Sequence, residues 1–271
     1  MADYYVPIKN QSYLDMYTFE EMNLPFWRQW FADNWIWSVY IGVLYVISIF
    51  SCQRFMKNRE AFDLRKALAM WNFGMAAFSI FAFSRVFPEI FFLLRKPNGL
   101  HAAACKIEDH GMTMAFWALT YTLSKVLQLG DTLFIVLRKK KLILLHWYHH
   151  ASVMILSWYA YQTYIPLLRF VGTMNYFVHG WMYTYYGLRA LEIKVPKRVS
   201  IFVTILELMQ MMAGFAVTLF CLWQYNYGDN GCLISARAIT PSAAIYSTLF
   251  VLFAKHFRST AFKQKGKLKP T

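Results

Sequence analysis

Charged residues are scarce in this chain, and acidic ones are the scarcest. Only 15% of the 271 residues are charged, against roughly a quarter in ordinary soluble domains. The chain has 14 Asp and Glu, 28 Lys and Arg, and 58% hydrophobic residues, and a soluble domain of this length would expose large apolar patches. With 12 glycines and 4 cysteines, the composition also argues against a collagen-like repeat, disorder or a disulfide scaffold. These shortages predict an integral membrane protein.

Seven stretches with little or no charge locate the expected membrane spans. A spanning helix needs about 20 mostly apolar residues, and the shortest stretches borrow a residue or two from their ends. The stretches are residues 34–53, 67–84, 111–137, 142–168, 170–188, 199–228 and 238–254. A turn near Pro166 separates the fourth from the fifth. We therefore expect an all-α integral membrane protein with seven transmembrane helices.

Basic residues gather in the segments on one side of these spans. Most of the Lys and Arg residues lie in 54–66, 138–141, 189–198 and 255–269. Cytoplasmic loops of membrane proteins are enriched in Lys and Arg, so we expect a cytosolic C-terminus and a lumenal N-terminus. Because the cations are spread over four short segments, nucleic acid is not an expected partner, whereas anionic lipid is. The expected parts are a lumenal segment at 1–33, a seven-helix catalytic domain at 34–257 and a basic cytosolic tail at 258–271.

Two short motifs agree with this orientation. Asn10 begins an Asn-Gln-Ser sequon, which is glycosylated only in the lumen. Lys267 and Lys269 lie five and three residues from the end, as in the dilysine retrieval signal that is read on cytosolic tails of endoplasmic reticulum proteins. No apolar stretch follows a basic start, so no signal peptide is expected. The sequence predicts a multi-pass protein of the endoplasmic reticulum membrane, glycosylated at Asn10.

The four cysteines fall into two pairs. Cys105 and Cys232 lie in the two long loops assigned to the lumen, where disulfides form, so we expect a bridge between them, with two free thiols as the alternative. Cys52 and Cys221 lie within spans and are interpreted as small apolar residues. The loop histidines His101 and His110 are expected to be ordinary surface residues.

Polar residues interrupt four consecutive spans at helical spacing. The sets are Lys125, Gln128, Asp131 and Thr132; His146, His149 and His150; Asn175, His179 and Tyr186; and Glu207, Gln210 and Gly214. Polar groups inside a span are costly and by default functional, so we predict that these sets meet around one interior. The structural alternative is that they tie helices together, at roughly 0.6 kcal/mol per hydrogen bond.

Clustered histidines allow two kinds of chemistry. They can ligate a metal, as in membrane di-iron desaturases and hydroxylases, or act as base and nucleophile. The desaturases carry more histidine boxes than this chain has, so we expect no metal and no bound cofactor. A seven-helix transporter or receptor is the other alternative, and no inverted repeat of the transporter kind is apparent.

At these residues the chain resembles the ELO family of fatty acid elongases. Leu145 to His150 resembles the family's LHxYHH box, Lys125 to Thr132 its KxxExxDT motif, and Asn175 to Leu188 its NxxxHxxMYxYYxL motif. The agreement extends from about residue 30 to 258, although Gln128 occupies a position that is usually Glu and Glu207 one that is usually Gln. The Trp within the box suggests the subgroup that acts on saturated, shorter long chains.

The resemblance implies a fold and a reaction. Six of the seven helices would form an inverted barrel around a tunnel that is closed toward the lumen. Long-chain acyl-CoA would condense with malonyl-CoA, releasing CO2 and CoA and giving a 3-oxoacyl-CoA through a histidine acyl-enzyme. Expected partners are these two substrates, membrane lipid and the ketoacyl reductase, dehydratase and enoyl reductase of the elongation cycle. A homodimer is left open.

The same resemblance implies roles for the residues of the box and the helices beside it. His149 would accept the acyl group, with His150 and His146 orienting it and moving protons. His179 and Asn175 would hold the thioester carbonyl or the enolate.

Other polar residues would support the histidines or bind the substrates. Asp131 would fix a histidine tautomer, and Lys125 would neutralise Asp131 or contact the malonyl carboxylate. The complete set of expected substrate-binding residues is Lys125, Gln128, Arg138, Lys139, Tyr186, Gln210, Lys255 and Arg258.

Overall fold

The computed structural model describes residues 8–262 except 10, 108, 230 and 235. These residues form a short 3-10 helix, η1 (Thr18–Glu20), and ten α-helices, with an isolated bridge between Ile8 and His110 and no β-strand among them. The α-helices are α1 (Leu24–Asn34), α2 (Trp37–Met56), α3 (Arg65–Leu94), α4 (Gly99–Cys105), α5 (Met112–Leu127), α6 (Gly130–Leu137), α7 (Leu144–Thr163), α8 (Leu167–Ala190), α9 (Lys197–Tyr227) and α10 (Ala236–Phe262). The expected all-helical class is confirmed.

Long helices cover each stretch that the sequence marks as apolar. Of the described helices, α2, α3 and α9 are long and apolar enough to cross a membrane by length and composition. On α2 the side chains of Leu44 and Ile47 are 62% and 57% exposed, which is unfavourable in water and favourable in lipid. The chain is therefore a membrane protein.

The third expected span is broken near its middle. Helix α5 ends at Leu127 and α6 begins at Gly130, with Gln128 and Leu129 in helical conformation between them. A Cβ atom on Gly130 would lie 3.1 Å from the ring of Trp71. The glycine thus allows the tryptophan of α3 to pack against the break, which redirects the chain beside the polar residues on either side.

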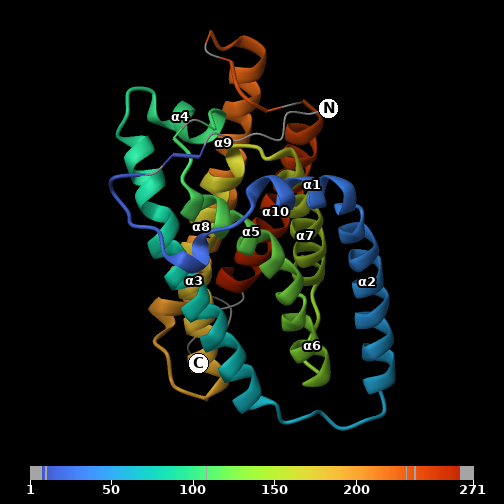
Figure 1. The fold of residues 1–271 in the computed structure, drawn as a ribbon. Coiled ribbons are helices and arrows are strands. Elements are labelled where there is room, and N and C mark those ends of the chain that lie inside the picture. The colour runs from blue at the N-terminus through green and yellow to red at the C-terminus, as the bar shows by residue number, and fades with distance from the viewer. Residues whose placement is uncertain (1–7, 10, 108, 230, 235, 263–271) are drawn as a thin grey trace.

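Helices run up and down between two ends of the bundle. Figure 1 shows the connections after α2, α6 and α8 and the end of α10 at one end, and α4 with the connection after α9 at the other. The described parts of the four basic segments therefore share one end. Helix α2 lies at the edge of the bundle, where it packs on α6 and α7 (Figure 1).

The N-terminal segment reaches into the bundle rather than resting on its surface. The Glu20 carboxylate is fully buried and accepts hydrogen bonds from Arg85 of α3 and from Trp117 and Thr113 of α5. Burial opposes ionisation of Glu20, but the hydrogen bonds from Arg85 and Trp117 outweigh it and lower the pKa of this carboxyl. A charged pair of this kind tolerates burial because both partners are fully hydrogen-bonded.

A second buried polar cluster closes the same end. Glu89 of α3 accepts from Arg169 at 3.2 Å and lies 3.1 Å from His110 Nδ1, whose other ring nitrogen is 2.8 Å from the Tyr164 hydroxyl. His101 is buried as well. The expectation that His101 and His110 are surface residues is therefore wrong: both support the loops that cover this end.

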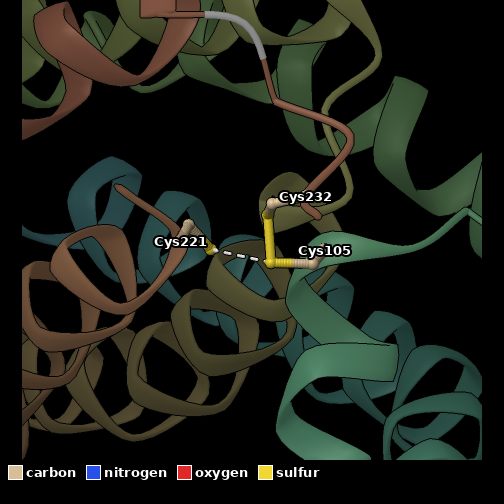
Figure 2. Close-up of side chains that lie close together, drawn as sticks. All are labelled: Cys105, Cys221 and Cys232. Atoms are coloured by element: carbon tan, nitrogen blue, oxygen red, sulfur yellow. Dashed lines mark hydrogen bonds between the residues drawn. A yellow bond between two sulfur atoms is a disulfide. The ribbon is translucent and has the colours of Figure 1, made fainter. Parts of the chain in front are cut away.

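The expected disulfide is present between Cys105, at the end of α4, and Cys232, in the connection before α10, with Cα atoms 4.5 Å apart. Figure 2 shows the thiol of Cys221, from α9, beside this bridge. Its Sγ lies 3.9 Å from the Cys105 Sγ, and its S–H donates to the Ala104 carbonyl at 3.6 Å. The bridge and this buried thiol thus join three separate segments at one point.

Candidate functional site

The histidines of the box, His146, His149 and His150, lie in the first turns of α7, and their rings are close together. His149 lines an internal cavity together with Asn175. The His146 ring is 4.4 Å from that of His150 between centroids, and the His149 ring is 5.5 Å from it. The box is therefore one contiguous cluster, of which His149 is the member that lines the cavity.

His146 is held from the neighbouring helix. Its Nε2 lies 2.9 Å from the hydroxyl of Thr132 on α6, and that hydroxyl lies 2.6 Å from the Tyr45 hydroxyl on α2. Thr132 is fully buried. This chain of contacts fixes one ring nitrogen of His146 and connects the box to the edge helix, which suits His146 to positioning more than to covalent chemistry.

Asp131 contacts the box less directly than expected. Its carboxylate accepts hydrogen bonds from Trp71 Nε1 at 2.6 Å and from the Tyr183 hydroxyl at 2.7 Å. The nearest histidine nitrogen that pairs with it, His150 Nε2, is 3.9 Å away, too far for a hydrogen bond. In this structure Asp131 therefore makes no hydrogen bond to a histidine and is held by Trp71 and Tyr183 instead.

Lys125 contacts amide groups and not Asp131. Its ammonium donates to Asn175 Oδ1 at 2.7 Å and to Gln128 Oε1 at 3.2 Å, and it lies over the Tyr121 ring at 4.2 Å. The expected neutralising pair of Lys125 with Asp131 is therefore not formed. Lys125 instead joins α5 to α8 and, as a donor only, determines which way both amides are turned.

The amide nitrogens of Asn175 and Gln128, whose oxygens accept from Lys125, both face the His179 ring. Asn175 Nδ2 is 3.0 Å from His179 Nε2, and Gln128 Nε2 is 3.4 Å from His179 Nδ1. An amide nitrogen only donates, whereas a neutral imidazole has one donor and one acceptor nitrogen. A single acceptor nitrogen can serve only one of the two amides. We assign it to Nε2 because that contact is the shorter, which places the N–H at Nδ1 opposite a second donor. This contact between two donors is a direct consequence of having Gln at position 128.

The cavity beside His149 lies among five helices. It has a volume of about 50 Å³ and is lined mainly by apolar residues of α5, α7, α8, α9 and α10, with Tyr121 and Tyr246 as its largest side chains. His149 lies in the first turns of α7, and Ala160 of the same helix also lines the cavity. At 1.5 Å per residue, these two positions are about 16 Å apart. The lining is mainly apolar and extends over this length of α7, and the open volume is that of only about one or two water molecules.

The residues expected to bind substrate are only partly brought together. Gln210 lines the cavity and is buried, and Lys125 and Gln128 lie beside it. Tyr186 is 44% exposed and does not line it.

The expected cations at the basic end belong to two different elements, the end of α6 and the end of α10. Lys139 donates instead to the backbone carbonyls of Lys57 and Arg59, beyond the end of α2. Arg138 caps the end of α6, while Lys255 and Arg258 are exposed near the end of α10. Asn10, Lys267 and Lys269 lie outside the described residues.

Several aromatic residues of the site carry no signal in the sequence. Tyr45 and Trp71 lie in apolar stretches where an aromatic side chain is equally expected to pack in the core or face lipid, yet they contact Thr132 and Asp131. Tyr183 follows His179 by one helical turn, and this spacing is the one signal that could have indicated its contact with Asp131.

Comparisons with known proteins agree on one family. The family described as ELO: GNS1/SUR4 family matches residues 30–269. "Very long chain fatty acid elongase 6" of Drosophila melanogaster is 42% identical over 233 residues, covering 85% of this chain and 73% of the relative. The human protein of that name is 38% identical, covering 90% of each chain. Human "Very long chain fatty acid elongase 3" is 36% identical, covering 89% of each.

Proposed function

This chain belongs to the ELO (GNS1/SUR4) family, and from that membership we propose that it is an acyltransferase of fatty acid elongation, a 3-oxoacyl-CoA synthase. The single observation that supports this most directly is that His149 opens onto a narrow apolar cavity beside Asn175. A nucleophile beside an apolar lining suits an acyl chain bound with its thioester at the histidine, and the lining side chains must move apart to admit the chain because the cavity measures only about 50 Å³. The substrates are long-chain acyl-CoA and malonyl-CoA, and the product is two carbons longer.

The first half of the reaction transfers the acyl group to His149. An unprotonated ring nitrogen attacks the thioester carbonyl, the carbon–sulfur bond breaks, and CoA leaves with the electron pair and takes up a proton. The His150 ring lies 5.5 Å from the His149 ring between centroids, and we assign it the transfer of this proton. His146, which is held by Thr132, keeps the cluster in place. The apolar lining protects the acyl-imidazole from water.

The second half joins the two carbon chains. Malonyl-CoA loses CO2, and the electron pair of the broken carbon–carbon bond becomes an enolate that attacks the acyl carbon and releases His149. The developing negative charge needs fixed donors nearby. Asn175 of α8 brings an amide to the cavity wall as the nearest donor group, and Lys125 and His179 hold that amide in place.

The finer architecture and cellular setting belong to the same proposal. Seven helical segments cross the membrane, six of them around the tunnel, with residues 1–33, 34–257 and 258–271 as lumenal segment, catalytic domain and cytosolic tail. The protein resides in the endoplasmic reticulum membrane with its N-terminus lumenal, and Asn10 is glycosylated. Its partners are the reductases and dehydratase of the cycle. The gathering of the described parts of the basic segments at one end of the bundle supports this orientation.

The proposal includes catalysis by free imidazoles, without a bound metal. His146 Nε2 is occupied by Thr132 and His179 Nε2 by Asn175, so these nitrogens already have partners. Elemental analysis of active protein checks this point. Stoichiometric iron or zinc, together with loss of activity on chelation, would contradict it.

One assay tests the function itself. Purified protein in detergent or lipid is mixed with a saturated long-chain acyl-CoA and malonyl-CoA that is radiolabelled in its free carboxyl group. We expect release of labelled CO2 that depends on the acyl-CoA, and a 3-oxoacyl-CoA product by mass spectrometry. Labelled CO2 that appears equally without acyl-CoA, or no release at all, would overturn the proposal.

A further inference from the structure

A second cavity lies outside the catalytic region, between the ends of α2 and α6. Its volume is about 450 Å³. The lining residues are Phe50, Gln53, Arg54, Met56, Lys57, Val136, Lys139 and Lys140. No residue lines both this cavity and the one beside His149, so the two are separate spaces.

The charge of this cavity is entirely positive. Four of its eight lining residues are Lys or Arg, and none is Asp or Glu. Among the described residues, Arg54, Lys57 and Lys140 form no ion pair with a carboxylate. Cations that share a concave site without counter-charges attract an anion, which neutralises their mutual repulsion.

Lys139 fixes the shape of the wall. Its backbone adopts a left-handed conformation with φ 52°, which is uncommon for a residue with a side chain. Its ammonium donates to the carbonyls of Lys57 at 3.1 Å and Arg59 at 2.8 Å, and Phe62 N–H donates to the Leu137 carbonyl at 3.1 Å. The ends of α2 and α6 are thereby held together below the opening, so the cavity is built by specific contacts.

The depth of the cavity matches the headgroup region of a bilayer. Helix α2 has 20 residues, from Trp37 to Met56, and therefore spans about 30 Å, the thickness of the hydrocarbon core. Arg54 and Lys57 at its end then lie at the level of the lipid phosphates. The apolar part of the lining is formed by Phe50, Met56 and Val136, and of these Phe50, on the edge helix, is 44% exposed.

We propose that this cavity binds the headgroup of an anionic phospholipid from the surrounding membrane. The phosphate and any further acidic group of the lipid contact Arg54, Lys57 and Lys140, and the glycerol and first chain carbons lie on Phe50 and Val136. A soluble phosphate or the phosphates of CoA share the anionic chemistry but would leave the apolar wall uncovered. Continuity with the exposed apolar face of α2 therefore favours the lipid.

The test measures which lipid stays bound to the purified protein. Protein in nanodiscs of phosphatidylcholine with a minor fraction of phosphatidylserine is released into native mass spectrometry, and retained lipids are identified by mass. We compare wild type with the triple variant Arg54→Gln, Lys57→Gln, Lys140→Gln. The matched control is Lys194→Gln, Lys197→Gln, Arg198→Gln, which removes three exposed cations at the same end, one from the connection between α8 and α9 and two from the start of α9.

We expect wild type and the control to retain phosphatidylserine and the cavity variant to retain at least about tenfold less, because each cation near the phosphates contributes to attraction. Equal loss in both triple variants would show a general surface-charge effect and overturn the proposal. So would failure of the wild type to prefer phosphatidylserine. Size-exclusion profiles check folding, and the single variant Lys140→Glu replaces the triple variant if the latter does not fold.

Competition distinguishes the lipid from soluble phosphates. Inorganic phosphate and CoA are added before release, and retained phosphatidylserine is measured again. We expect no displacement at concentrations that leave the protein folded, because neither competitor covers Phe50 and Val136. Displacement of the lipid by either compound in wild type would reassign the cavity to a soluble phosphate and contradict the lipid proposal.

Discussion

Lys125 donates a hydrogen bond to Asn175 Oδ1 at 2.7 Å, and this contact joins α5 to α8 at the wall of the cavity beside His149. A buried ammonium with amide partners and no carboxylate within ion-pairing distance is an expensive arrangement. It also fixes the orientation of both amides that face His179. The hydrogen-bond partners between α5 and α8 thus depend on Gln128 as well as on His179.

Replacing Gln128 by Glu should stabilise the protein. A carboxylate at this position would lie about 3.2 Å from Lys125 Nζ, as the amide oxygen does now, and its other oxygen could accept the N–H at His179 Nδ1 that now meets a donor. Hydrogen bonds to charged groups contribute about 1.5–3 kcal/mol. We expect Gln128→Glu to raise the melting temperature by a few degrees, roughly 2–4 °C per kcal/mol, and to retain condensation activity.

The control for this prediction is Gln128→Met. Methionine fills a similar volume but leaves the Lys125 ammonium with one fewer acceptor, so it should lower the melting temperature. Thermal unfolding followed by fluorescence in detergent measures both variants. If Glu destabilises the protein as much as Met does, the amide and histidine orientations described above are wrong.

Replacing His149 by Ala should abolish condensation while the fold is kept. His149 is the box histidine that lines the cavity, and loss of a covalent nucleophile costs about four or more orders of magnitude in rate. Incubation of wild type with acyl-CoA alone should release CoA and add one acyl mass to the protein. Intact-protein mass spectrometry of His149→Ala should show no such adduct.

Two controls accompany the His149 variant. His150→Ala should weaken the partial reaction without removing it, because His150 adjoins the nucleophile and does not line the cavity. Leu133→Ala, at an exposed position of α6, should leave it unchanged. Turnover by His149→Ala near the wild-type rate would remove the nucleophile assignment and make His179 the next candidate.

The path of the chain was largely predictable from its apolar stretches. The turn expected near Pro166 is present, because Tyr164 adopts a left-handed conformation that ends α7 before α8 begins at Leu167. The break between α5 and α6 was not predictable. It depends on how closely Trp71 approaches Gly130, and such tertiary contacts have no local signature in a uniformly apolar stretch.

The site residues were predictable by type but not by partner. Helical spacing correctly brought Lys125 and Asn175 into one interior. It could not show that Asp131 bonds to Trp71 and Tyr183 rather than to a histidine or Lys125, because partner choice depends on the rotation and depth of neighbouring helices. His110 was misjudged for a related reason, since a loop histidine becomes buried only when other segments cover it.

Residues at the far end of the catalytic cavity should determine product length. Leu168, in the first turn of α8, lines the cavity at the end opposite His149. Leu168→Ala should therefore give longer products, measured by gas chromatography of the fatty acids. In contrast, Gly214→Ala should shorten them, because its Cβ would lie 2.5 Å from Tyr246, a cavity residue that would have to move inward.

The matched control for cavity length is Leu219→Ala, which changes a 44% exposed side chain on α9. It makes the same chemical change at a position that does not line the cavity, and product length should not shift. Variants of Leu168 and Gly214 that alter only the rate, with an unchanged product distribution, would refute this account of chain length.

The stability that Asp109 contributes should disappear in acid. Hydrogen bonds from Lys9 and then Lys96 lower the pKa of this carboxyl in the folded protein. A carboxyl with a lowered folded pKa adds stability above its unfolded pKa of about 3.9, and this contribution is lost as the pH falls through the folded value. We expect Asp109→Asn to melt below wild type at neutral pH, by about 1 kcal/mol or less, and the gap to close as the pH drops below about 4.

Melting curves between neutral and acidic pH test this dependence. The control is Glu21→Gln, which changes an exposed carboxylate in the segment before α1 and should match wild type throughout. If the difference in melting temperature between wild type and Asp109→Asn stays constant into acid, the ion pairs of Asp109 with Lys9 and Lys96 do not account for that difference.

Removing Cys232 should allow a different bridge to form. In Cys232→Ser, the Cys105 thiol is freed beside the buried thiol of Cys221, whose Sγ is 3.9 Å away (Figure 2). Two thiols this close need only a small side-chain movement to reach bonding distance. With added diamide as the oxidant, we expect a peptide pair joining Cys105 to Cys221 in non-reducing mass spectrometry, with loss of one hydrogen from each thiol.

The double variant Cys232→Ser, Cys221→Ser should lack this peptide pair. Recovery of the peptide with a free Cys105 thiol checks that this region of the protein is digested. Free Cys105 and Cys221 in the single variant after oxidation would mean that the wall between α4 and α9 is too rigid for the thiols to meet.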